Sequence, residues 1–160
     1  MCANQCYIFV SMQIVLAHLG PRTPAKDPFE ALTSMYLERI STYARSQSES
    51  FRDEASLFAW IDRQQRRAPA VTVLLDSRGR QLSSESFAEW LGRQRDTSAQ
   101  LIVFAIGPAD GWTEASRNRA TLLLSLGPMT LAHTLARLVV AEQVYRAFTI
   151  LTGHPYHSGH

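Results

Sequence analysis

The chain has 160 residues, of which 46% are hydrophobic and 19% charged, a composition that predicts one globular domain and excludes a disordered protein. Its net charge of +2 argues neither for nor against a nucleic-acid partner. Fifteen of its 16 basic residues are arginine, a bias that either phosphate binding or a high-GC genome would produce. The two cysteines, Cys2 and Cys6, predict reduced thiols rather than a disulfide framework or a four-ligand zinc site.

The first twenty residues are apolar but contain no Lys or Arg, so the basic segment of a signal peptide is missing. Polar residues interrupt any membrane span there, and we expect a cytoplasmic protein without a membrane partner. Met12 begins the first predicted strand. We therefore interpret residues 1–11 as an N-terminal extension, or as the product of a start codon assigned too far upstream, and residues 12–160 as a single domain.

The first predicted elements alternate between strand and helix. An apolar run predicts a strand over residues 12–18. A helix follows over 27–44, with Asp27 as its N-cap and Pro28 in its first helical position. The polar residues 45–52 are predicted to form a connecting loop.

The alternation continues through the middle of the chain. Residues 53–67 predict an amphipathic helix with acids in its first turn and arginines in its last. The continuous apolar run at 71–76 is typical of a strand buried on both faces of a parallel sheet, and 77–80 are predicted to turn the chain. Serine caps begin a helix over 83–94, and a buried strand over 101–111 ends in a Gly-Pro-x-x-Gly loop.

The last predicted elements are a short helix at about 113–120, a strand at 121–127 and a long helix that begins near Leu131. Strands thus alternate with helices throughout. This order predicts an α/β fold with a mainly parallel sheet and helices on both faces.

Ligands of such sheets bind beyond the carboxyl ends of the strands, which here are followed by loops at 75–79, 107–111 and 126–131. Glycines in these loops allow close backbone approach, although ordinary strand-ending turns explain them equally well. The chain contains neither a dinucleotide-binding G-x-G-x-x-G nor a P-loop, and neither a G-x-S-x-G nor an H-E-x-x-H motif. The familiar cofactor and hydrolase motifs are therefore absent.

Three of the five histidines lie in the last seven residues. A metal-dependent hydrolase that uses His133, His154 and His157 is a distant alternative, but no carboxylate accompanies the tail histidines, and we predict no metal. Glu142 and Arg146 are spaced i, i+4 on the last helix, which is compatible with a simple surface ion pair or with a functional pair.

Residues 129–157 read MTLAHTLARLVVAEQVYRAFTILTGHPYH, and this segment closely resembles the C-terminus of the ribosomal RNA large-subunit methyltransferase H family, minimal SPOUT methyltransferases. Three upstream segments match the same family: VTVLLDSRGRQLSSESFAEWL, IGPADG and LLSLGPMTL. The resemblance spans about 12–157 and is dense from Val71 onward.

The resemblance implies a homodimer whose α/β fold contains a deep trefoil knot at about 101–157, with S-adenosylmethionine bound in the knot largely by backbone groups. It implies methylation at N3 of a pseudouridine in 23S rRNA of the assembled ribosome. By match, the cofactor-binding residues are Leu75, Gly107, Leu126, Gly127, Pro128, Met129, Thr130 and Leu131. A side chain at Gly107 is expected to occupy the space of the adenosine.

N3 of pseudouridine is an imide nitrogen that attacks well only after it loses its proton, so a nearby base would help. The resemblance thus implies a catalytic group of His157, Tyr156, Glu142 and Arg146, with His157 as base and Tyr156 against the flipped base. His133 and Arg137 are expected to bind RNA. In this interpretation the tail caps the active site, either its own or that of the partner subunit.

Two departures from the family favour an alternative from another class, an inactive SPOUT-fold protein that binds RNA or the ribosome. Pro108 stands where the family carries the second glycine of a Gly-Gly pair. The segment 45–70 lacks the family's lysine-rich stretch. Binding of S-adenosylmethionine would separate the two hypotheses, because the inactive protein need not bind it.

Overall fold

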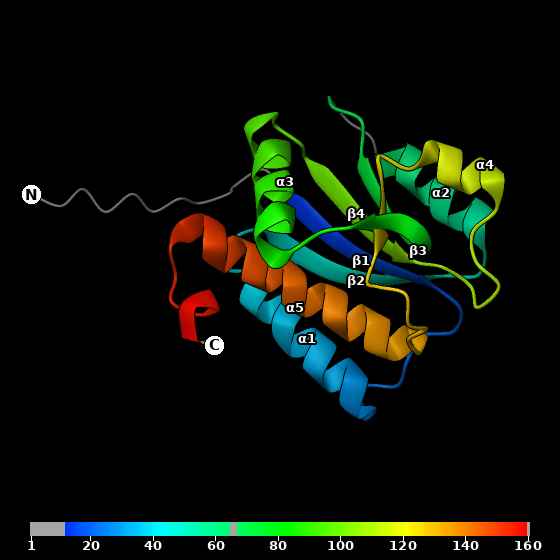
Figure 1. The fold of residues 1–160 in the computed structure, drawn as a ribbon. Helices are drawn as coiled ribbons and strands as arrows, with labels where there is room; N and C mark the ends of the chain where they lie inside the picture. The colour runs from blue at the N-terminus through cyan, green and yellow to red at the C-terminus, as the bar shows by residue number, and fades with distance from the viewer. Residues whose placement is uncertain (1–11, 65–66, 160) are drawn as a thin grey trace, which may run out of the picture.

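The computed structural model describes residues 12–64 and 67–159, and the predicted extension 1–11 lies outside these residues. Five parallel strands form one sheet in the order β2-β1-β4-β3-β5 (Figure 1). The strands are β1 (Gln13–Leu19), β2 (Arg45–Phe51), β3 (Val71–Gln81), β4 (Leu101–Ile106) and β5 (Leu122–Ser125). The helices are α1 (Pro28–Ile40), α2 (Glu54–Gln64), α3 (Ser84–Asp96), α4 (Glu114–Arg119) and α5 (His133–Thr152), and a short 3₁₀ helix, η1 (His157–Gly159), follows. The predicted α/β fold is confirmed.

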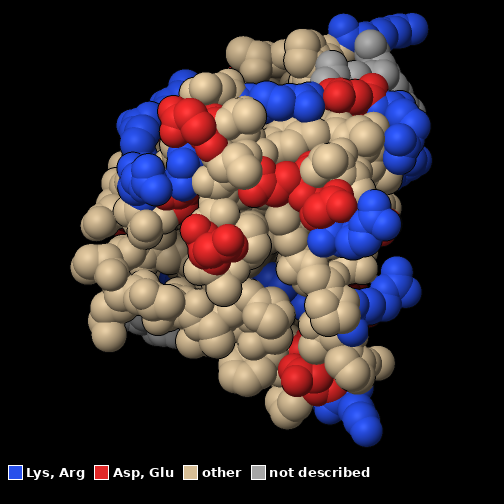
Figure 2. Space-filling model, turned by 90° about the vertical axis from the view of Figure 1, so that its right-hand side faces the viewer, with Lys and Arg blue, Asp and Glu red and all other residues tan. Residues whose placement is uncertain are grey.

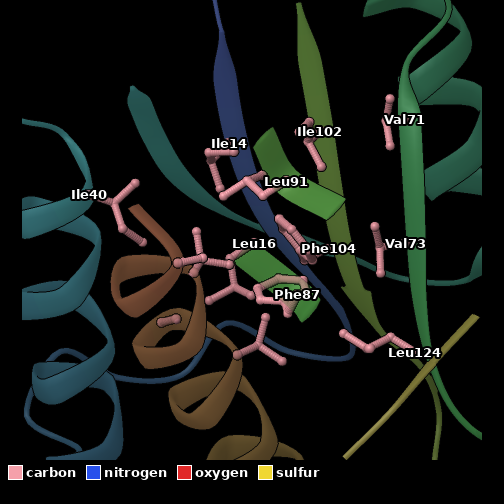
Figure 3. Packing of buried hydrophobic residues seen from close by; sticks show 14 of the residues in the cluster. Ile14, Leu16, Ile40, Val71, Val73, Phe87, Leu91, Ile102, Phe104 and Leu124 are labelled. Carbon is pink, nitrogen blue, oxygen red and sulfur yellow. The ribbon is translucent and has the colours of Figure 1, made fainter. Parts of the chain in front are cut away.

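Side chains from the two faces of the sheet enter two separate cores. Ile14 and Leu16 of β1 pack toward α1, α3 and α5, whereas Val15 and Ala17 pack toward α2. Figure 3 shows Ile14 and Leu16 beside Phe104 of β4 and the side chains of α3. Burial on both faces explains why the central strands are continuous apolar runs rather than alternating ones.

Residues 45–52, predicted as a loop, instead contain strand β2, which pairs with β1 from Gln13↔Arg45 to Leu19↔Phe51. The prediction failed because RSQSESF has no apolar pattern. An edge strand that is only half buried is held by its backbone ladder and needs no such pattern. Polar contacts add to the ladder: Gln13 donates to Gln47 at 3.1 Å, and the Ser46 hydroxyl donates to the Leu37 carbonyl.

The predicted turn at 77–80 is also wrong, because β3 continues to Gln81. Leu124 of β5 pairs with both Leu75 and Arg80, so the four residues between them bulge out of the strand. A Cβ at Gly79 would lie 2.6 Å from the backbone of Leu123. Glycine is therefore required there for the two strands to approach each other.

Helix α5 begins at His133 and ends at Thr152, and its C-cap is Gly153, whose left-handed φ of 69° turns the tail away from the helix axis. The chain then folds back beside the C-terminal half of α5 (Figure 1). Among the described residues, no helix has both the length and the apolarity needed to cross a membrane.

Candidate cofactor cavity and C-terminal cluster

A cavity of about 620 Å³ lies beyond the carboxyl ends of β4 and β5 and beside residues 75–78 of β3. Its lining includes all the residues predicted to bind the cofactor: Leu75, Gly107, Leu126, Gly127, Pro128, Met129, Thr130 and Leu131. Gly127 has a φ of 117°, and a Cβ built there would meet no atom within 4 Å. Backbone conformation rather than crowding therefore favours glycine at this point of the loop.

Trp112 forms part of the cavity lining and was not singled out from the sequence. Its side chain is 3% exposed, and its indole N–H donates to the Leu75 carbonyl at 2.9 Å. A Cβ at Gly107 would lie 2.6 Å from the indole. The expectation that a side chain at Gly107 enters adenosine space is therefore wrong: it would first meet Trp112.

Asp76 and Arg117 form an ion pair at the edge of the cavity, with 2.7 Å between Nε and Oδ2. Burial by itself would raise the pKa of Asp76. Hydrogen bonds from the Arg117 guanidinium and the Arg78 backbone N–H outweigh burial, and the pKa lies below its ordinary value. The same hydrogen bond to Asp76 raises the pKa of Arg117. This pair joins the bulge of β3 to α4.

His133, predicted to bind RNA, is an exposed residue at the rim of the cavity, in the first turn of α5. Its ring stacks at 6.4 Å on that of His18, which is buried. Burial, more than any other effect, lowers the pKa of His18, although its hydrogen bond with the Pro21 carbonyl opposes this. His133 is thus accessible to a ligand, whereas His18 supports it from the interior.

Arg137, the other residue predicted to bind RNA, is only 2% exposed. Its guanidinium lies 3.0 Å from the Glu30 carboxylate and donates to the hydroxyls of Thr23 and Ser48, each at 3.0 Å. These bonds join α5 to α1, β2 and the β1–α1 loop. Its burial contradicts the prediction that Arg137 holds a phosphate at the surface.

The four residues predicted to be catalytic are joined by hydrogen bonds, and we call Glu142, Arg146, Tyr156 and His157 the C-terminal cluster. Glu142 Oε1 accepts from Arg146 Nε and Nη2 at 3.0 and 2.7 Å and from the Tyr156 hydroxyl at 3.0 Å. Glu142 Oε2 accepts from Gln143 at 2.7 Å. With both oxygens engaged, Glu142 is suited to orienting its neighbours.

Tyr156 lies between α5 and α1. Its hydroxyl is 3.3 Å from that of Tyr36, its ring meets Tyr145 edge-on at 4.9 Å, and the Arg146 guanidinium lies 5.0 Å from the ring centroid. Burial, followed by the contacts with Tyr36 and Glu142, raises the pKa of Tyr156 well above its usual range. Tyr156 therefore remains a neutral hydroxyl at physiological pH.

The two ring nitrogens of His157 have different partners. Nδ1 lies 3.3 Å from Arg146 Nη1, and Nε2 lies 3.0 Å from Glu85 Oε1. A guanidinium can only donate, so Nδ1 is the acceptor and the proton is on Nε2, where it is donated to Glu85. This tautomer leaves a basic nitrogen facing the arginine.

Within the chain the C-terminal cluster does not border the cavity. His133 lies at the rim of the cavity, and Glu142 and Arg146 follow it by nine and thirteen residues in α5, or about 14 and 20 Å at about 1.5 Å per residue. The same separation keeps His133 apart from the tail histidines. Within the described residues no group of three or more His, Cys, Asp and Glu is placed to hold a metal ion.

Figure 2 shows the molecule from the side on which α2 and α4 lie in Figure 1. Basic and acidic side chains alternate on this face, and a broad uncharged area adjoins them. Arg119 of α4 is paired with Asp62 of α2, and Arg52 is paired with Asp53 directly before α2. No continuous basic surface covers this face.

A family model described as "Predicted SPOUT methyltransferase" matches residues 12–157. The chain is 50% identical over 131 residues to a protein of Koribacter versatilis named ribosomal RNA large subunit methyltransferase H. The matched residues cover 82% of this chain and 89% of that protein. It is 52% identical over 88 residues to a protein of the same name from Brucella anthropi, covering 55% of each. The chain is also similar in fold to the SpoU methyltransferase AviRb from Streptomyces viridochromogenes, whose structure was solved in complex with the cofactor AdoMet. The TM-score is 0.50 and the sequence identity 14%, and the match covers 85% of this chain and 57% of that one.

Proposed function

The chain belongs to the SPOUT methyltransferase family, and we propose that it transfers a methyl group from S-adenosylmethionine to N3 of a pseudouridine in 23S rRNA of the assembled ribosome, in the cytoplasm. The strongest support is the cavity that gathers all eight residues expected to bind the cofactor. The names of the relatives support ribosomal RNA as the substrate.

The cavity fits S-adenosylmethionine in size and in chemistry. Its volume of about 620 Å³ lies within the range of about 300–1,000 Å³ for ligand pockets. Leucine side chains offer apolar contact to an adenine ring, the loop 126–131 offers backbone groups, and the exposed Asp110 offers a carboxylate to a cationic ligand. When bound, S-adenosylmethionine supplies an electrophilic methyl group. Leu75, Gly107 and the loop 126–131 are the residues that would hold it.

The C-terminal cluster supplies the groups that an imide nucleophile needs. His157 Nδ1 can accept the N3 proton once the Arg146 N–H, 3.3 Å away, turns from it toward the target base, and Glu85 stabilises the imidazolium that results. Arg146 remains a cation beside it, because the Glu142 carboxylate raises the pKa of Arg146 further, and it can stabilise the negative charge that develops on the imide. Tyr156 offers a ring face and a neutral hydroxyl to the target base.

We propose a homodimer in which the C-terminal cluster of one protomer faces the cavity of the other. Methyl transfer needs reacting atoms about 3–3.5 Å apart, whereas the cluster and the cavity rim are about 14–20 Å apart along α5 of one chain. Exposed apolar side chains, with exposures of 40% at Phe29, 46% at Leu32 and 82% at Met129, are available for a subunit interface. Homodimers usually have two-fold symmetry.

We also propose the trefoil knot at about 101–157 that membership of the family implies. Its support is that β5 pairs with β3 although β4 lies between them in the sequence, and that α5 then packs against both α1 and α3.

Isothermal titration calorimetry with S-adenosylmethionine tests the cofactor, and transfer of a labelled methyl group to ribosomes tests the reaction. We expect both binding and transfer. Binding to ribosomes without cofactor affinity would instead support the inactive RNA-binding alternative. Pro108 does not favour that alternative by distorting the loop, because its carbonyl accepts the Gly111 N–H at 2.9 Å in an ordinary turn.

A further inference from the structure

Trp112 connects two of the segments that line the cofactor cavity. Its N–H donates to the carbonyl of Leu75, the last residue of β3 that pairs with β4, and its ring fills the space beside Gly107, directly after β4. The ladder between β3 and β4 ends with the pair Leu75 and Ile106, and the hydrogen bond from the indole to the Leu75 carbonyl lies just beyond it. The indole therefore fixes Gly107 and the loop that follows it against Leu75, where the ladder no longer does so.

The position of Trp112 is itself fixed from both sides along the chain. The turn at 108–111 closes through the Gly111 N–H and the Pro108 carbonyl, and Gly111 takes a φ of 87°. Immediately after Trp112, Thr113 caps α4 through the Ser116 N–H and donates its hydroxyl to Glu54 of α2 at 2.6 Å. The indole is thus held by a turn on one side and by a capped helix on the other.

The burial of Trp112 restricts its side chain to this position. Trp112 is 3% exposed and packs in the core between the sheet and α2, with Leu57 and Phe58 of that helix in the same cluster. A tryptophan needs a partner for its N–H when it is buried, and the Leu75 carbonyl is that partner. Loss of the N–H would leave this carbonyl of the cavity wall unpaired.

We propose that Trp112 is a positioning residue of the cofactor site, which holds the Leu75 carbonyl and the Gly107 backbone, just beyond the β3–β4 ladder, in the positions that S-adenosylmethionine requires. This inference rests on the proposed function, because it assigns to the cavity the cofactor proposed above. Trp112 acts through the two residues it fixes. Replacement of Trp112 should therefore weaken cofactor binding more than the accompanying loss of folding stability alone would explain.

The test compares Trp112→Phe with Trp90→Phe in the full chain. Trp90 is 6% exposed and belongs to the other core, beside Phe87, and it is not among the residues that line the cavity. Calorimetry with S-adenosylmethionine should show a Kd raised by about tenfold or more in Trp112→Phe and changed by less than about twofold in Trp90→Phe, with both variants losing stability. An unchanged Kd in Trp112→Phe, or an equal increase in both variants, would overturn the proposal.

A second measurement keeps the native indole. In the Trp60→Phe/Trp90→Phe variant, Trp112 is the only tryptophan, and titration with S-adenosylmethionine should change its fluorescence emission with the Kd found by calorimetry. Constant emission during binding would overturn the proposal. Absence of calorimetric binding in the unmodified protein would instead overturn the proposed function, and the inference with it, so the two failures are distinguishable.

Discussion

Replacement of Arg137 by methionine separates a structural role from an RNA-binding one. The substitution keeps most of the apolar stem but removes the guanidinium that contacts Glu30, Thr23 and Ser48. The Glu30 side chain is only 17% exposed, so its carboxylate would be left unpaired in a poorly solvated place. Breaking a buried ion pair by removing one partner costs about 3–5 kcal/mol. For a chain of this size, at about 2–4 °C per kcal/mol, Tm should fall by about 6–20 °C.

The matched control is Arg119→Met. Arg119 pairs with Asp62 at the surface, where the two side chains are 44% and 52% exposed. An exposed pair contributes about 0–1 kcal/mol, so Tm of this variant should change by less than about 4 °C. Thermal unfolding followed by circular dichroism measures both. A wild-type Tm for Arg137→Met, together with weakened binding to ribosomes, would refute the structural role and restore the phosphate contact.

Three further predictions concern the base, the strand bulge and the buried ion pair. His157→Ala should lower the rate of single-turnover methyl transfer to ribosomes by about 10²–10⁴-fold. Glu85→Gln should lower it by a smaller factor, because the base His157 remains. Full activity of both variants would remove His157 from the mechanism. Gly79→Ala should destabilise the protein in urea unfolding by about 1–3 kcal/mol, because its Cβ would lie 2.6 Å from the β5 backbone, and unchanged stability would contradict the close approach of the strands. Asp76→Asn should lower Tm at pH 7. The difference in Tm from the unmodified protein should shrink as the pH falls below 3.8, the ordinary pKa of the carboxyl group. The reason is that a carboxyl group whose pKa is lowered in the folded state contributes stability only while it is charged. A difference independent of pH would contradict the ion pair with Arg117.

The sequence predicted the elements whose burial leaves a pattern in the residue types. Continuous apolar runs revealed the central strands β1, β3 and β4 and the edge strand β5, because side chains on both faces of these strands are covered. Strand β2 was missed because its side chains are polar and only partly buried, so that backbone pairing, which no side-chain pattern records, holds it in the sheet. The bulge before Arg80 was read as a turn because glycine signals both, and only the partner strand distinguishes them.

Some residues of the candidate site were predicted from the sequence and others were not. Resemblance to a family identified the loop 126–131 and the C-terminal cluster, and these residues lie together in space as groups. Resemblance did not reveal that Arg137 is buried, because an arginine at a helical position looks the same whether it faces solvent or Glu30. Trp112 was missed because its function depends on contacts with residues far away in the chain, of which the only local sign is an aromatic residue directly after a glycine loop.

The proposed methylation of a pseudouridine in ribosomal RNA is tested most directly on ribosomes that lack this modification. Ribosomes from cells without the gene would be incubated with the purified protein and S-adenosylmethionine, and the nucleosides of 23S rRNA would then be separated and identified by mass spectrometry. We predict one new nucleoside, a pseudouridine methylated at N3, which does not form when S-adenosylmethionine is left out. Unchanged nucleosides despite measurable cofactor binding, or a methyl group on a different nucleoside, would contradict the account.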